Sequence, residues 1–170
     1  MASNGVRYVS TRDEFSLELL PTTFGYPLIG RTSDDQDIRA VPGSDDYVSY
    51  SGFMNPASIF RKESTPPVDL ATLRVEEIRY AANRGGPLVH KSTRDPQLIA
   101  EVIRSVQTAP VPLPRTDQIY HIELLSPDLP GLAYSIYVIF DSSGAVYFAP
   151  LYDDQNGVPA GPLFSQWVNQ

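Results

Sequence analysis

The stretch that decides the fold runs from Gln118 to Val158, QIYHIELLSPDLPGLAYSIYVIFDSSGAVYFAPLYDDQNGV. From Tyr120 to Leu124, apolar residues alternate with His121 and Glu123, which is the period of a strand with one buried face. Turn formers fill residues 126–131 and end this strand. We therefore expect three consecutive antiparallel strands, of which this segment is the first.

The second strand of this meander is predicted at Leu132–Phe140, which is apolar at nearly every position and so fits a central strand buried on both faces. A tight turn at 141–144 follows, with Gly144 free to take positive φ. The third strand is expected at Ala145–Tyr152. Asn156-Gly157 then predicts a type I′ hairpin turn.

One helix precedes the meander. Asp95 is a good N-cap and Pro96 suits the first helical position, so the helix is expected over 96–106. The proline-rich segment 109–114 ends it as a stiff, extended connector. The apolar stripe of the helix should cover the inner face of the meander. The expected contacts join Ile99, Val102, Ile103 and Val106 to Ile122, Leu124, Ile136 and Val138.

The remaining strands are less clearly marked. Candidates in the first half are Phe15–Leu20, Ile38–Val41 and Tyr47–Phe53, and two more are expected at Leu73–Tyr80 and Pro87–His90, turning at 83–86. In the tail, Leu163, Phe164 and the single Trp167 are expected to dock the C-terminus onto the sheet.

These elements predict an α+β fold with a mainly antiparallel sheet of about five strands and one principal helix packed on one face. We expect a single domain over 1–170. Within it, 1–67 is irregular or β-rich, and 73–170 forms a strand–strand–helix–meander core.

Composition excludes several classes of protein. The net charge of −7 opposes a general nucleic-acid or anionic-membrane surface, because both attract cations. No apolar run reaches the roughly 18 residues that span a bilayer, so no transmembrane segment is expected. The absence of cysteine excludes disulfides, thiolate catalysis and cysteine metal sites.

Catalytic motifs are not evident in the sequence. His90 and His121 are the only histidines, and two are too few for a typical zinc site. His121 is expected on the more polar face of its strand, so both histidines are interpreted as surface or partly buried residues. Ser51-Gly52 has no preceding glycine and therefore does not form a nucleophile elbow. We predict no catalytic and no cofactor-binding residues.

Acidic clusters raise the question of calcium. Aligning Gly157 with the invariant glycine of a calcium loop puts Tyr152 and Leu163 at ligand positions, where both fail. The acidic residues Asp34, Asp35, Asp37, Asp45 and Asp46 could instead supply the oxygen ligands of an irregular calcium site. We favour the interpretation that they lie in solvated loops. We expect that neither folding nor function needs a metal.

Paired carboxylates are the remaining chemical option. Glu76 and Glu77 are adjacent, so on a strand they point to opposite faces and do not flank one bond. Glu123 and Asp141 are the pair that the meander could bring together. The ten tyrosines suit an adaptable binding surface, although most are expected to be ordinary sheet residues.

The order of strand, strand, Asp95-Pro96 helix, Tyr120-x-Ile122 and Tyr134-x-Ile136-x-Val138 resembles uncharacterised extracytoplasmic lipoprotein domains of Gram-positive bacteria. The resemblance covers residues 73–152 and rests on hydrophobic patterns and turns. It implies a surface-tethered, non-enzymatic binding or sensing module, with a lipid anchor outside these 170 residues. That family has no defined catalytic residues to carry over.

Two function classes therefore stay open. The first is a non-catalytic extracytoplasmic domain that binds an unknown protein, peptide or carbohydrate. The second is a small cytosolic enzyme, hydrolase-like, with an unrecognised site. The polar opening Met1–Gly5 fits a cytosolic protein or an exported one whose signal has been removed, and we favour export. A binding surface is expected on the sheet face away from the helix or on the acidic loops of the first half.

Overall fold

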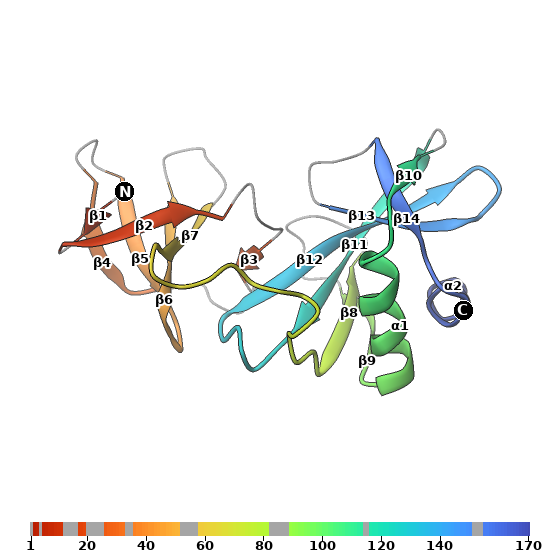
Figure 1. The fold of residues 1–170 in the computed structure, drawn as a ribbon, viewed down its shortest axis with the longest axis horizontal. Coiled ribbons are helices and arrows are strands. Elements are labelled where there is room, and N and C mark those ends of the chain that lie inside the picture. Colours follow the sequence, from red (N-terminus) through yellow and green to blue (C-terminus); the bar gives the residue numbers. More distant parts are fainter. Residues whose placement is uncertain are drawn as a thin grey trace. The chain divides into compact units, whose positions relative to one another are not determined.

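The computed structural model describes residues 2–3, 5–11, 17–19, 26–32, 36–51, 58–81, 89–113, 116–150 and 155–170 (Figure 1). These residues fold into two compact units, each described by itself below. The first comprises 1–68 and 128–133, and the second comprises 69–127 and 134–170. The described elements make an α+β fold with two antiparallel sheets and two helices.

The first unit is built on a sheet with the strand order β1-β2-β7-β6-β5-β4. The strands are β1 (Ala2–Ser3), β2 (Val6–Ser10), β4 (Leu28–Arg31), β5 (Asp37–Val41), β6 (Ser44–Ser51) and β7 (Ser58–Lys62). Strand β3 (Leu17–Leu19) also belongs to this unit. The strands expected at Ile38–Val41 and Tyr47–Phe53 correspond to β5 and β6. The interior of this unit includes Ile38, Val41, Val48 and Ile59, all buried.

The second unit contains a sheet with the order β10-β14-β13-β12-β11-β8-β9. Its strands are β8 (Glu77–Ala81), β9 (Val89–Thr93), β10 (Val111–Pro112), β11 (Thr116–Leu125), β12 (Leu132–Asp141), β13 (Val146–Pro150) and β14 (Asn156–Pro159). Strand β12 lies at the middle of this order, as the run of apolar residues predicted. The expected turn before β13 is also present, with Gly144 at φ 84°.

Helix α1 (Pro96–Val106) has the predicted bounds. The Asp95 carboxylate accepts a hydrogen bond from the Gln97 backbone N–H at 2.9 Å, so Asp95 caps the helix as expected. The apolar stripe of α1 packs on the sheet of the second unit. Ile99 and Val102 are buried against Ile122, Leu124, Ile136 and Val138, and Ile103 and Val106 are partly buried there. The predicted helix–meander contact is confirmed.

A second helix, α2 (Pro162–Asn169), was not expected. It packs on the same face of the sheet as α1, with Phe164 completely buried against Phe148 (Figure 1). Its N-cap, Gly161, has no side chain, and a Cβ there would collide with the Glu101 carboxyl group. That carboxylate instead accepts hydrogen bonds from the N–H groups of Phe164 (2.8 Å) and Leu163 (3.2 Å).

The C-terminal end of α2 is held by a residue from β9. The Lys91 ammonium group donates hydrogen bonds to the carbonyl oxygens of Trp167 (2.7 Å) and Val168 (3.2 Å) and lies 5.3 Å from the centre of the Trp167 ring. Phe164 and Trp167 dock the tail onto the sheet as predicted. Leu163 does not, because its side chain is exposed.

Three expectations about elements need correction. About five strands in one sheet and one helix were predicted, whereas the described residues form two sheets and two helices. Asn156-Gly157 is not a hairpin turn but the start of β14, because these residues pair with Pro112 and Val111 of β10. Of the segment Leu73–Tyr80, which was expected to be a strand, only the last part is extended, as part of β8 (Glu77–Ala81). The turn expected at 83–86 lies outside the described residues.

Val102→Asp tests the helix–sheet contact. Val102 is completely buried, so a carboxylate there should lower the free energy of unfolding by about 3 kcal/mol. Ala100→Asp places the same group on the exposed side of the same helix and should have a much smaller effect. Chemical denaturation measures both. Equal midpoints for Val102→Asp and the unchanged protein would show that the stripe is not part of the core.

Candidate functional site

The face of the second sheet opposite the helices carries a row of polar side chains, which we call the polar band. Strand register places Glu123 of β11 directly opposite Arg79 of β8 on one side and Ser135 of β12 on the other. His121 lies opposite Tyr137 in the same way. The members are Glu77 and Arg79 of β8, Arg94 just after β9, His121 and Glu123 of β11, and Ser135 and Tyr137 of β12.

Exposure differs among the members of the polar band, and Glu77 beside the β9 edge is only 11% exposed. The Arg94 side chain is 80% exposed, that of Arg79 32% and that of Glu123 10%, whereas Ser135 is completely buried. The β9 edge is therefore open to solvent, and the β12 end is closed. A buried polar group on a sheet face requires an explanation that an exposed one does not, because burial without a hydrogen-bond partner is unfavourable.

At the open end, Glu77 holds two arginines. Arg79 Nε donates to Glu77 Oε1 at 2.8 Å, and Arg94 donates to Oε2 through Nε at 3.0 Å and through Nη2 at 2.8 Å. The hydrogen bonds from Arg79 and then Arg94 lower the pKa of the Glu77 carboxyl group, although burial opposes them. Two guanidinium groups thus share one carboxylate, which leaves an excess positive charge.

At the closed end, His121 Nε2 lies 4.0 Å from Glu123 Oε1, and both side chains are buried. The Ser135 hydroxyl oxygen has no hydrogen-bond partner among the residues that the structure describes. Burying a hydroxyl without a hydrogen bond costs about 1–3 kcal/mol, so native proteins seldom keep one without a reason. Ser135 is therefore the member of the polar band that most needs an explanation.

The strand register does not place Ser135 directly opposite His121. A serine nucleophile needs a hydrogen bond to its base. Ser135 lies opposite Glu123, so His121 is only its diagonal neighbour on the sheet.

The structure corrects the interpretation of His121. The residue does lie on the more polar face of its strand, but that face is covered and His121 is 5% exposed. The backbone of His90 lies in β9, and its side chain is outside the described residues. Ser51 ends β6, and Gly52 lies outside the described residues too.

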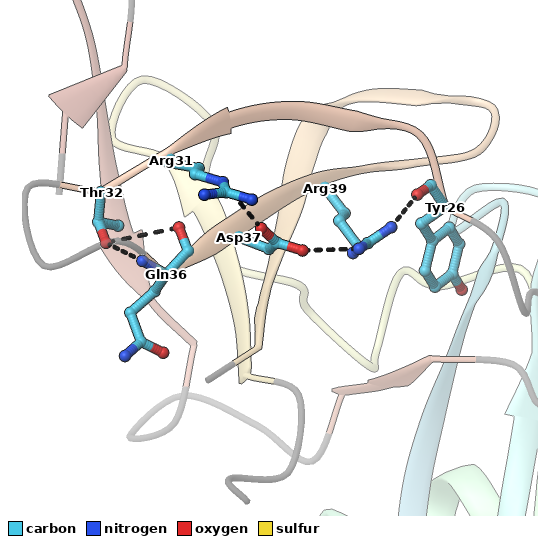
Figure 2. A network of polar contacts seen from close by, with 6 residues as sticks. All are labelled: Tyr26, Arg31, Thr32, Gln36, Asp37 and Arg39. Carbon is cyan, nitrogen blue, oxygen red and sulfur yellow. Dashed lines mark hydrogen bonds and ion pairs between the residues drawn. The ribbon is translucent and has the colours of Figure 1, made fainter. Parts of the chain in front are cut away.

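The acidic residues of the first half are only partly described. Asp37 accepts from Arg39 Nη2 at 2.6 Å and lies 3.3 Å from Arg31 Nε (Figure 2). Asp46 lies 3.7 Å from Lys62 Nζ, and Asp45 is exposed. Asp34, Asp35, Asp153 and Asp154 fall outside the described residues.

The part of the chain that the structure describes contains no group of three or more His, Asp or Glu side chains that could hold a metal ion. That metal is not needed stays a prediction.

The paired carboxylates do not come together. Glu76 is exposed and lies 3.9 Å from Arg74, whereas Glu77 belongs to the polar band on the other face. Glu123 lies opposite Ser135, six residues along β12 from Asp141, or roughly 20 Å at the rise of a strand. Asp141 instead organises its turn, and hydrogen bonds led by that from Ser143 lower the pKa of its carboxyl group.

A second surface lies at the edge of the first sheet. Among the described strands, β4 pairs only with β5, and its register shifts at Ile29 as in a β-bulge. Leu28 is 49% exposed and Ile29 is 44% exposed, so two consecutive large apolar side chains meet solvent here.

The β4–β5 hairpin is held by a polar network (Figure 2). Asp37 bridges Arg31 and Arg39, and Arg39 Nη1 donates to the Tyr26 carbonyl oxygen at 3.0 Å. Just after β4 and just before β5, the Thr32 backbone N–H donates to the Gln36 carbonyl oxygen at 2.9 Å, and the Gln36 N–H donates to the Thr32 hydroxyl at 3.0 Å. These contacts fix the shape of the edge.

Comparison of the chain with family models, curated proteins and solved structures gave no match. Among the described residues, no helix has the length and apolar character required to cross a membrane.

Sequence reasoning missed most of the polar band. Ser135 and Tyr137 lie within a run interpreted as apolar on both faces, and Arg79 lies within the strand expected at Leu73–Tyr80 without being singled out. One signal was present. Ser135 and Tyr137 alternate with Tyr134, Ile136 and Val138, which is the period of a strand with two different faces.

Glu77→Gln should reduce stability at neutral pH and have little effect at low pH. The arginines lower the pKa of Glu77 in the folded state, so its contribution is complete above the unfolded pKa of about 4.3 and disappears as the pH falls through the folded pKa. Denaturation at neutral and acidic pH measures the difference. Glu76→Gln is the exposed control, and a Glu77→Gln effect that is independent of pH would contradict the assignment.

Ser135→Ala should raise the free energy of unfolding by about 1 kcal/mol, because it removes a buried hydroxyl that has no partner among the described residues. Ser142→Ala, at an exposed turn position, should leave stability unchanged within about 0.5 kcal/mol. Thermal and chemical denaturation measure both. Destabilisation by Ser135→Ala would mean that the hydroxyl has a stabilising partner.

Proposed function

We propose that this protein is a non-catalytic binding or sensing domain that captures an extended segment of another protein on the free edge of β4. The resemblance to extracytoplasmic lipoprotein domains supports a place at the cell surface. The observation that carries the proposal is the edge itself, where Leu28 and Ile29 are the first and third most exposed large apolar side chains described.

Strand addition explains why such an edge would be kept. An edge strand presents backbone N–H and C=O groups that pair readily with another chain, and natural proteins usually protect such edges with charges, prolines or covering elements. Here the outer side of β4 is unpaired among the described strands. Arg31 and the bulge at Ile29 give it some protection, but two exposed apolar side chains accompany it. An extended partner would gain main-chain hydrogen bonds from the backbone and affinity from Leu28 and Ile29.

Rigidity of the hairpin supports the same function. Binding is stronger when the contact surface does not need to be ordered first. The Asp37 bridge between Arg31 and Arg39 and the Thr32–Gln36 pair fix β4 against β5. Tyr26 adds a further anchor, because its hydroxyl donates to the Gly131 carbonyl oxygen at 3.1 Å.

A displayed library of random peptides tests this function. Peptides selected on the protein should bind the unchanged chain, and Ile29→Lys should weaken them by roughly tenfold or more, because it removes an apolar contact and adds a charge at the edge. Leu163→Lys changes a similarly exposed apolar residue in the second unit and should leave binding unchanged.

Backbone dependence provides the second readout. Selected peptides that are N-methylated at alternate residues lose their donors on one edge, and one of the two methylation registers should abolish binding while the other retains it. The proposal fails if no peptide is selected or if Ile29→Lys binds as the unchanged protein does. Reproducible hydrolase turnover that His121→Ala abolishes, with folding intact, would instead favour an enzyme.

A further inference from the structure

Helix α2 is held at each end by one charged side chain from another element. At its N-terminus, the Glu101 carboxylate of α1 accepts hydrogen bonds from the N–H groups of Phe164 (2.8 Å) and Leu163 (3.2 Å). At its C-terminus, the Lys91 ammonium group of β9 donates to the carbonyl oxygen of Trp167 at 2.7 Å. A negative group thus meets the positive end of the helix dipole, and a positive group meets the negative end.

Between these two contacts, aromatic rings form the floor on which α2 lies. Phe164 is completely buried, and its ring centre lies 4.7 Å from that of Phe148 on β13. The Trp167 ring centre lies 6.3 Å from that of Tyr80 on β8. The sheet and the core join β13, β8, α1 and β9 to one another without α2. We call the four residues that receive α2 the α2 seat: Phe148, Tyr80, Glu101 and Lys91.

Helix α2 is a weak occupant of the α2 seat. Only Phe164 and Val168 are buried among its eight residues, whereas forming the helix fixes the backbone of all eight. Its N-cap, Gly161, has no side chain to accept a hydrogen bond. Its first turn has no acidic residue and its last turn no basic one, so neither end is supported from within the helix. Docking of α2 is therefore a local equilibrium that can open while the sheet stays folded.

The missing charges are what the α2 seat requires. In an ordinary helix, acidic residues in the first turn and basic residues in the last turn are favourable. Here an acidic first turn would face Glu101, and a basic last turn would face Lys91, so both would be repelled. The α2 seat therefore selects a helix of about two turns with uncharged ends. It also selects aromatic side chains three positions apart, as Phe164 and Trp167 are.

A second copy of this chain would compete poorly for the α2 seat. Its α2 has the same sequence as the resident helix, which is tethered to β14 through Ala160 and Gly161 and so has a high effective concentration. The net charge of −7 also makes two copies repel each other. A successful competitor must instead form its helix more readily than α2 does.

We propose that the α2 seat is a docking site for a short amphipathic helix of a different protein, and that α2 is a latch which covers the site until that helix displaces it. The partner helix has uncharged ends, carries two aromatic residues three positions apart and is more stable as a helix than α2. The inference concerns the second unit and does not depend on the proposed function of β4.

A synthetic peptide with the sequence of residues 159–170 tests displacement from the intact chain. A covalent staple between positions 162 and 166, which are both exposed in α2, preforms its helix. Trp167→Phe in the peptide removes its own fluorescence. Trp167 of the protein is then the single tryptophan present, so its emission reports the release of α2. Saturating peptide should shift this emission to longer wavelengths, because the ring leaves the α2 seat for water.

Charge at the two ends of the peptide is the specific test. Leu163→Glu in the peptide should weaken displacement roughly fivefold relative to its uncharged match, Leu163→Gln. Asn169→Lys should do the same relative to Asn169→Gln. Both charges would strengthen an ordinary helix, so helix stability alone predicts the opposite sign. Ile29→Lys in the protein should leave displacement unchanged, which separates this site from β4.

The proposal is overturned if saturating peptide leaves the emission of Trp167 unchanged, or if the charged and uncharged peptides act equally. A dimer that forms as the protein concentration rises, and that the peptide dissociates, would assign the α2 seat to a second copy and overturn the choice of partner.

Discussion

The pairing of β11 with β12 is the constraint on which the second unit depends. Its register from Gln118 to Leu124 assigns every side chain of the two strands to one face or the other. Ile122, Leu124, Ile136 and Val138 meet the helices, and His121, Glu123, Ser135 and Tyr137 meet each other on the opposite face. Because strand periodicity is two, a slip of one residue would put the polar set under the helices and destroy the core.

Local signals accounted for the elements that could be predicted. Helix α1 has its cap, its proline and its stripe within a dozen residues, so its bounds followed from the sequence. Helix α2 begins at a glycine without a capping side chain, and its cap is Glu101, 62 residues earlier. Asn156-Gly157 was misread for the same reason, because a partner strand more than 40 residues away extends it. In both cases tertiary contacts override local preference.

The candidate site was only half visible for a related reason. The sequence placed His121 and Glu123 on a polar face, but burial of that face is a property of the whole fold. Ser135 and Tyr137 were hidden within a strand that is apolar overall. The exposed Leu28 and Ile29 were equally hard to find, since exposure of single apolar residues is common and only their position at a sheet edge gives it meaning.

The way in which α2 is held has a consequence for the order of folding. An isolated helix of eight residues is not stable in water. Glu101 of α1 caps the N-terminus of α2, and Lys91 of β9 donates to carbonyl oxygens at its C-terminus. The apolar face of α2 packs on β13. Each of these partners must be in place before α2 gains anything by forming. It therefore becomes ordered only after α1, β9 and β13, and until then the side of Phe148 that Phe164 covers is exposed.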